Sequence, residues 1–501
     1  MKNNIKTLKF FGWIIIAAMF FSACTDFMEL NPQDKISSET FWKTEKDVQG
    51  ALAATYVRYR STAIAGLGAG NGSAMDHDVI SDDAHSGSGF LSLQPIATGG
   101  ISSSQGGYVS TLWQDAWQGV AYCNYFLDNI DRAKTFLSDA KYKQYKGEGL
   151  FNRCYFYNEL VQYYGDLPLV LKSVATTDPY KEMPRESKAT IVAQLLKDID
   201  EAIAGLPNIA YTNGHAVKGS AIMLKVRILM NNDKYAEAAT VAGDYINSPD
   251  NKFKLADSYE GIFFGQQDKN PEIMFSVQYA GPSDLHQLDQ YTGSRMSCYP
   301  LADFVNSYEE KSPGVKDPRM KMTIFQKGDV WVQSNTGLFP APNTVTNAEG
   351  RIPWTGYAWR KYVNPALVQA RNQISDQDNV IMRYADLLLR YAEAVVTSGT
   401  GDRALALKAL NDVRGRKGVE MPPVADADFT IEKVRHERRI ELAYEGHRYK
   451  DLIRWKIADQ VITKKVYDAK GSKCKFNGWL WPVPQGVMDI MSPLWSQNEG
   501  Y

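Results

Sequence analysis

The chain has 501 residues, of which 44% are hydrophobic and 23% charged, with 56 basic side chains against 57 acidic ones. This is the composition of an ordinary globular protein, and the near-zero charge balance excludes the basic excess expected of a nucleic-acid-binding protein. Its length corresponds to about three average domains or to one large composite body. Aromatic residues make up 12% of the chain, so we expect some rings to serve recognition.

The N-terminus has the pattern of an export signal. Three lysines precede an apolar run over residues 10–21, and small residues then lead to Cys24. The run is shorter than the roughly 20 apolar residues of a membrane-spanning helix, so it predicts a cleaved signal over residues 1–23 rather than a span or a short core helix. The site Phe21-Ser22-Ala23-Cys24 resembles a bacterial lipobox, in which the cysteine is lipidated and anchors the mature chain to a membrane.

Residues 61–110 are rich in Gly, Ser and Asp and show little periodicity. They contain a cluster of acidic residues and histidines: Asp76, His77, Asp78, Asp82, Asp83 and His85. Carboxylates with histidine can bind a metal, and a structural calcium remains open, but no fixed metal-ligand spacing is present. We therefore favour a polar loop whose carboxylates form turns and helix caps, and predict no cofactor.

Several segments have the periodicity of helices that form pairs. The predicted helices cover residues 145–164, 188–204, 217–230, 234–247, 380–396 and 402–416. In 188–204, Ile191, Leu195, Ile199 and Ala202 form one apolar stripe. Alanines in the 234–247 segment would allow helices to approach closely, a pattern similar to tetratricopeptide repeats. The predicted fold class is all-α, with tetratricopeptide-like helix pairs, long irregular insertions and a few short strands.

The second irregular region, residues 260–375, contains strand-like runs at Ile273–Val277, Met322–Phe325 and Ala358–Val363. It also carries rings set among Gly, Pro, Asn and Thr, and an aromatic wall with a few placed polar groups is typical of a ligand site. We expect Trp359 and Tyr362 to be core residues. The candidates for stacking on a sugar are Tyr291, Trp331, Trp354 and Tyr357. Rings on the paired helices, such as Tyr155, Tyr157 and Trp455, are expected in the core.

The segment 435–455 is dense in charges at helical neighbour spacing. The residues concerned are Arg438, Arg439, Glu441, Glu445, Arg448, Asp451 and Arg454. Because acids balance bases, we predict a structural ion-pair network that pins two helices, in preference to an arginine-rich anion site.

Nothing in the sequence marks a catalytic centre. The nucleophile pattern Gly-x-Ser-x-Gly is absent, and no pair of carboxylates is singled out as in a glycosidase. Cys123, Cys154, Cys298 and Cys474 allow three disulfide pairings, none in a Cys-x-x-Cys motif. We expect them to be buried free thiols.

The chain resembles the SusD/RagB family of outer-membrane lipoproteins from glycan-uptake systems of Bacteroidetes. The similarity begins after the lipobox with Asp26 and Glu29, continues through Trp113 and Trp117, and includes the closing Trp481-Pro482-Val483-Pro484. The most specific motif is Glu437-Arg438-Arg439-x-Glu441-Leu442-Ala443-x-Glu445-Gly446-x-Arg448, followed by Asp451-Leu452-x-Arg454-Trp455.

The resemblance implies a non-catalytic, lipid-anchored protein on the outer cell surface, which binds oligosaccharide and delivers it to a TonB-dependent, SusC-like transporter barrel. It implies an N-terminal part over residues 24–259 and a C-terminal part over 260–501. It places the glycan site in residues 75–108, with Asp83, Phe90 and Tyr108, and in residues 285–360. Two alternatives stay open, namely the same architecture with a peptide cargo and a lipid-anchored glycoside hydrolase.

Overall fold

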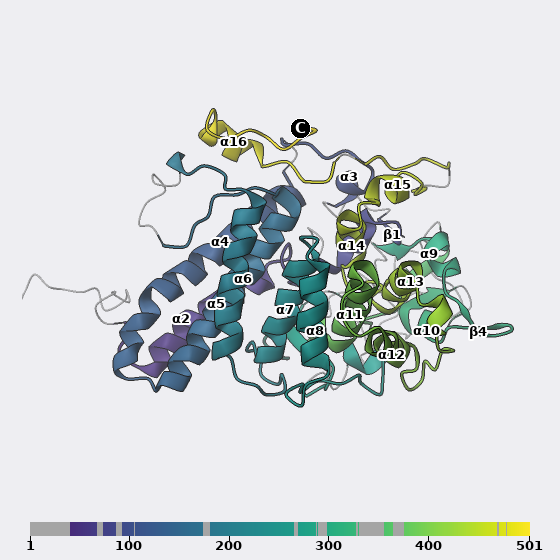
Figure 1. Ribbon diagram of the computed structural model, residues 1–501. Coiled ribbons are helices and arrows are strands. Elements are labelled where there is room, and N and C mark those ends of the chain that lie inside the picture. Colours follow the sequence, from purple (N-terminus) through teal and green to yellow (C-terminus); the bar gives the residue numbers. More distant parts are fainter. Residues whose placement is uncertain are drawn as a thin grey trace, which may run out of the picture.

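Helices stand side by side through most of the computed structural model (Figure 1). It describes residues 41–67, 74–86, 93–104, 106–173, 181–264, 269–286, 288, 298–326, 329, 355–363, 375–467, 470–476 and 478–501. The longer helices are α2 (Glu45–Val57), α4 (Tyr108–Asn129), α5 (Asp139–Tyr164), α6 (Lys188–Gly205), α7 (Lys218–Met230), α8 (Tyr235–Ile246), α11 (Tyr384–Ser398), α12 (Arg403–Arg414) and α13 (Ile431–Glu441). The short ones are α3 (Gln94–Ala97), α9 (Ala302–Asn306), α10 (Arg319–Thr323), α14 (Arg448–Arg454), α15 (Ala458–Ile462) and α16 (Gln485–Met491).

The long helices pack in chain order. Helix α4 lies on α5, α5 on α6, α6 on α7, and α7 on α8; α8 then packs on α11, which also contacts α12 and α13. The predicted all-α fold class with paired helices is confirmed. Helices α2, α4, α5 and α6 form the left side of Figure 1, α7 and α8 lie at its centre, and the C-terminal segment with α16 runs along the top.

Local sequence signals explain where these helices begin and how they pack. The Ser187 hydroxyl accepts a hydrogen bond from the Thr190 amide at the start of α6, and the predicted apolar stripe of that helix is buried. In α8 a Cβ on Gly243 would lie 2.9 Å from the ring of Tyr391 in α11, so only glycine allows this close approach.

The strands form two-stranded antiparallel sheets in the described parts of the chain. They are β1 (Ala84–His85) with β3 (Tyr299–Pro300), β2 (Ile273–Val277) with β8 (Asn379–Arg383), β4 (Glu310–Ser312) with β5 (Val315–Lys316), and β6 (Ile324–Gln326) with β7 (Tyr357–Trp359). The β1–β3 pair joins the first irregular region to the second, because Ala84 lies opposite Pro300 and His85 opposite Tyr299.

Three sequence predictions need correction. The helix predicted over 380–396 starts only at Tyr384, because Val380 and Met382 pair with β2 as part of strand β8. The strand predicted at Met322–Phe325 begins inside α10, which ends at Thr323. The strand predicted at Ala358–Val363 ends at Trp359, and Tyr362 has a positive φ of 69° that breaks the extended backbone. The strand at Ile273–Val277 is confirmed.

The rings and thiols expected in the core are found there. Tyr155, Tyr157, Trp455, Trp359 and Tyr362 are buried. Cys123, Cys154, Cys298 and Cys474 are free and buried, which confirms that prediction. The indole N–H of Trp359 donates to the sulfur of Cys298 at 3.3 Å.

The most unusual part of the interior is a network of buried ion pairs around α13 and α14. Glu441, at the end of α13, contacts three guanidinium groups: Arg319 at 2.9 Å, Arg383 at 2.7 Å and Arg416 at 2.8 Å. Arg383 also contacts Glu445 at 2.7 Å. Burial alone would raise the pKa of Glu441, but these arginines outweigh it and bring the pKa to about 2.

A second set of ion pairs joins α11 to α13 and α14. Arg438 contacts Asp386 at 2.8 Å and Asp451 at 3.1 Å. Arg454 contacts Asp451 at 2.9 Å and also pairs with Glu393. All five side chains are buried, so each charge depends on its partners for the stabilisation that water would otherwise give.

A third set ties the first irregular region to the same helices. Arg439 contacts Asp83 at 2.6 Å, and Arg448 contacts Asp82 at 2.8 Å. The Asp78 carboxylate accepts a hydrogen bond from the Tyr444 amide at 2.5 Å. The expectation that these acids belong to a polar loop of turns and caps was therefore wrong. Asp83, which is buried, and Asp82, which is partly buried, are counter-ions of arginines more than 350 residues away. Asp78 is held by a backbone amide of the same distant segment.

Removing one arginine from this network should be costly. We expect Arg383→Met to lower the free energy of unfolding by about 3–5 kcal/mol, because Glu441, Glu445 and Glu272 would lose a buried counter-ion. The matched control is Arg403→Met, which removes a surface ion pair with Asp426 and should cost about 0–1 kcal/mol. Urea unfolding measures both. Equal losses would contradict a structural role for the buried pairs.

The network also predicts a dependence of stability on acid pH. The pKa of Glu441 is about 2 in the folded protein and about 4.3 in the unfolded chain. Its contribution to the free energy of unfolding is therefore fully present above the unfolded-state pKa. It should be lost as the pH falls from about 4.5 to 2, on the order of 3 kcal/mol. Urea unfolding at several pH values measures the decline. Glu441→Gln should flatten it, whereas Glu237→Gln, at an exposed ion pair, should not. A pH-independent stability of the unmodified protein would contradict this assignment.

Candidate functional site

Most of the predicted ligand residues lie outside the described residues, namely Phe90, Tyr291, Trp331 and Trp354, and so does the lipidation candidate Cys24. Three are described. Tyr108 is fully buried, and its hydroxyl donates to the Ala63 carbonyl at 2.8 Å. Asp83 is buried beside Arg439. Tyr357 in β7 is half-buried and packs against the hydrophobic core. The structure thus gives Tyr108 and Asp83 interior positions with protein partners.

A groove suited to a ligand lies between α4 and the C-terminal segment at residues 484–487, where α16 begins. Its volume is about 590 Å³, within the range of small-molecule sites. The lining residues are Ser103, Ser104, Gly106, Ser110, Trp113, Gln114, Trp117, Gln118, Ala121, Pro484, Gln485, Gly486 and Val487. We call it the tryptophan groove.

Trp113 and Trp117 are one helical turn apart on α4, so both reach the same side of the helix. Their ring centroids are 5.9 Å apart. Trp113 packs edge-on against Tyr164 at 4.9 Å, and Trp117 against Tyr157 at 5.6 Å. Because the rings contact other aromatic side chains, their orientation is set before any ligand arrives, which lowers the entropic cost of binding.

The rest of the lining consists of hydroxyl, amide and small apolar groups, with no ionisable side chain. The Ser103 hydroxyl donates to the Gln485 side-chain oxygen at 2.9 Å. In return, the backbone N–H of Gln485 donates to the Ser103 carbonyl at 3.0 Å. Arg58 holds the Gln118 oxygen at 2.7 Å. Gln114 and Gln118 are exposed. The groove therefore offers an aromatic surface beside uncharged donors and acceptors.

The sequence analysis used Trp113 and Trp117 only as part of the family resemblance, and their place in a groove was missed. A signal was present, since the Trp pair and the neighbouring pair Gln114 and Gln118 both recur every four residues. That spacing places amides beside rings on one helix. Ser103 and Ser104, by contrast, fall in the region 75–108 where the family resemblance placed part of a glycan site. Tyr357 pairs with Gln326 of β6, which contacts α10. Helix α10 lies well away from α16 in Figure 1.

Comparison with known proteins identifies the family. The SusD family model matches residues 259–501, and a second model, described as "Starch-binding associating with outer membrane", matches residues 26–228. The chain belongs to the SusD/RagB family. SusD-like protein P38 of Formosa agariphila is 24% identical over 92% of this chain and 93% of its own length.

Solved SusD-like structures share the fold. A SusD-like carbohydrate-binding protein of Bacteroides fragilis superposes with a TM-score of 0.76 at 24% identity, over 90% of this chain and 99% of that one. Surface glycan-binding protein A of Bacteroides fluxus superposes with a TM-score of 0.72 at 22% identity, over 91% and 100%. At this level of identity the superpositions show that this chain has the SusD-like fold.

In the part of the chain that the structure describes, no helix is both long and apolar enough to cross a membrane. Within the same residues, no three or more His, Cys, Asp or Glu side chains gather as metal ligands would. In the 76–85 region, Asp82 and Asp83 face arginines, and Asp78 accepts a hydrogen bond from the Tyr444 amide.

Proposed function

We propose that this protein is a cell-surface glycan-binding lipoprotein that captures oligosaccharide and passes it, chemically unchanged, to a partner TonB-dependent outer-membrane transporter. The observation that carries the binding function is the tryptophan groove, in which two fixed indoles lie beside exposed amides and hydroxyls. The apolar face of a pyranose ring can pack on an indole while amides bind its hydroxyl groups, which is the usual division of labour in a small-molecule site.

The relatives support a carbohydrate ligand. One matching family model is described as starch-binding, and similar structures are described as carbohydrate-binding, glycan-binding and laminarin-binding. We therefore propose the same ligand class for this chain. The rings of the second irregular region, Tyr291, Trp331 and Trp354, stay proposed as further contacts, together with Phe90 of the first.

The proposal of binding without hydrolysis agrees with the chemistry of the groove. Most glycosidases need two carboxyl groups flanking the scissile bond, one with a raised pKa as the acid. The groove lining has no Asp or Glu. The buried Glu441 lies in the ion-pair network instead, where arginines lower its pKa.

Binding to a panel of neutral polysaccharides tests the proposal. We expect Trp117→Ala to weaken glycan binding by about 2 kcal/mol, roughly 30-fold in affinity. The reason is that truncating a well-packed aromatic anchor removes both contact area and fixed geometry. Affinity electrophoresis and calorimetry measure the change. The control is Tyr125→Ala, which removes an exposed ring of the same helix outside the groove and should leave affinity unchanged.

Three outcomes would contradict the proposal. If the protein bound none of the glycans, or bound only peptides, carbohydrate would not be its ligand class. If Trp117→Ala and Tyr125→Ala changed glycan affinity equally, the tryptophan groove would not be the binding site. New reducing ends after incubation with the bound glycan would show hydrolysis.

The lipid anchor is tested separately. In cells supplied with a labelled fatty-acid analogue, the protein should incorporate label through Cys24, and Cys24→Ala should abolish it, because a lipobox cysteine is the acceptor implied by the sequence. Cys123→Ala, at a buried thiol, is the matched control and should retain the label. Labelling that persists in Cys24→Ala would contradict the assignment.

A further inference from the structure

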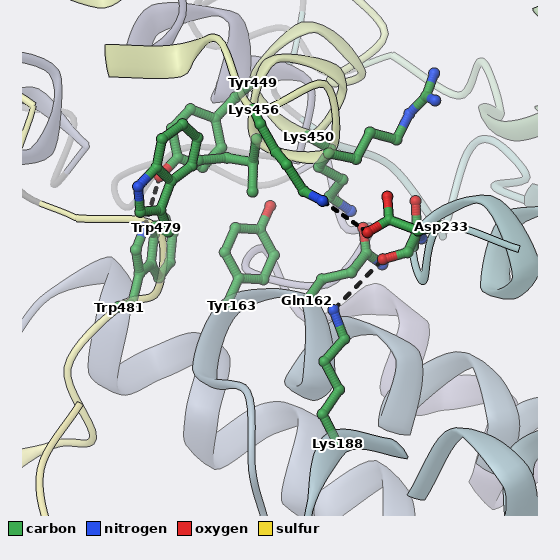
Figure 2. Close-up of a pocket in the computed structure, with 12 residues that line it drawn as sticks. Gln162, Tyr163, Lys188, Asp233, Tyr449, Lys450, Lys456, Trp479 and Trp481 are labelled. Carbon is green, nitrogen blue, oxygen red and sulfur yellow. Dashed lines mark hydrogen bonds and ion pairs between the residues drawn. The ribbon is translucent and has the colours of Figure 1, made fainter. Parts of the chain in front are cut away.

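A second cavity lies between the C-terminal end of α5, the turn joining α7 to α8, helix α14 and residues 479–481 (Figure 2). Its volume is about 110 Å³, and it shares no lining residue with the tryptophan groove. This space is small beside the 300–1,000 Å³ of sites for drug-sized ligands, so it suits one terminal sugar unit better than a chain.

One wall of the cavity is aromatic. Trp479 is 41% exposed and offers its indole to solvent, whereas Trp481, Tyr163 and Tyr449 are buried behind it. The rings of Tyr163 and Trp481 are 4.3 Å apart, and the Trp481 indole N–H donates to the Tyr449 hydroxyl at 3.1 Å. The wall is thus firmly held, and an exposed tryptophan stands at its edge (Figure 2).

The opposite wall is cationic. Lys188, Lys450, Lys456 and Arg454 line the cavity, against Asp233 as the one acidic lining residue. Lys450 is held by Glu159 at 2.7 Å, Arg454 by Glu393 and Asp451, and Lys456 by Asp233 at 2.8 Å. These three cations therefore have carboxylate partners.

Lys188 differs from them. Figure 2 shows it reaching from α6 toward the turn that carries Asp233, where its ammonium donates to the Asn231 carbonyl at 3.4 Å. Among the described residues no carboxylate lies within ion-pair distance of it. Burial lowers the pKa of Lys188, with only partial compensation from Asp233. An anion in the cavity would supply the missing partner.

We infer that this cavity is a second carbohydrate site, specific for a sugar unit that bears an anionic substituent, either a carboxylate or a sulfate ester. The sugar ring would pack on Trp479, and its anionic group would bind the Lys188 ammonium. A charge-assisted hydrogen bond of this kind is stronger than a neutral one. The inference rests on the proposed function, because it assumes that the protein binds glycans.

Calorimetry with matched oligosaccharides on the full protein tests this inference. The probes are a galacturonate trisaccharide, a sulfated galactose trisaccharide and the neutral galactose trisaccharide. We expect at least one anionic probe to bind about tenfold more tightly than the neutral one, with an affinity that falls as salt is raised. The comparison of the two anionic probes shows whether the carboxylate or the sulfate ester is preferred.

Two substitutions locate the effect. Lys188→Gln should abolish the preference for the anionic probe and leave neutral binding unchanged, whereas Lys197→Gln, an exposed lysine of the same helix, should change neither. Trp479→Ala should weaken binding of the anionic probe and leave the affinity of glycans bound in the tryptophan groove unchanged.

Equal affinity for anionic and neutral probes, or equal effects of Lys188→Gln and Lys197→Gln, would overturn the inference. If neutral glycans still bound, the proposed function would stand. If neither neutral nor anionic glycans bound, the proposed function itself would fall.

Discussion

Buried arginine–carboxylate pairing around α13 and α14 is the interaction on which the rest of this structure depends. Taking guanidinium and carboxylate groups out of water costs several kcal/mol per ion, and only close, multiple pairing recovers it. Glu441 meets this condition with three arginines, from α10, β8 and the segment after α12. The pairing is therefore satisfied only when segments far apart in the chain have come together. It makes the irregular regions part of the folded core.

This constraint also positions the surfaces that could bind a ligand. Asp82 and Asp83 hold the first irregular region against α13 and α14, and that region continues through α3 to Ser103, at the edge of the tryptophan groove. Helix α14, fixed through Asp451 and Arg454, carries Tyr449 and Lys450 of the second cavity. The second cavity of this SusD/RagB protein thus rests on a helix anchored by the network, and the tryptophan groove adjoins the region that Asp82 and Asp83 hold in place.

Local patterns in the sequence predicted the helices well, because an apolar stripe such as Ile191 to Ala202 reports directly on packing. They predicted the charges of 435–455 as structural but not their partners. Asp82 and Asp83 were misinterpreted because no local pattern reveals a counter-ion more than 350 residues away. Val380 to Met382 fitted a helical period, and only pairing with β2, about a hundred residues earlier, makes them a strand. The groove was missed for a related reason: its two walls, α4 and the segment around Gln485, meet only in the folded chain.

A crystal structure of the protein with a bound neutral oligosaccharide would test the central claim most directly. The account predicts a pyranose ring packed on the indole of Trp117, with its hydroxyls within hydrogen-bond distance of the Gln114 or Gln118 amide and the ion pairs of Glu441 unchanged. A sugar bound elsewhere, with the tryptophan groove empty, would contradict it.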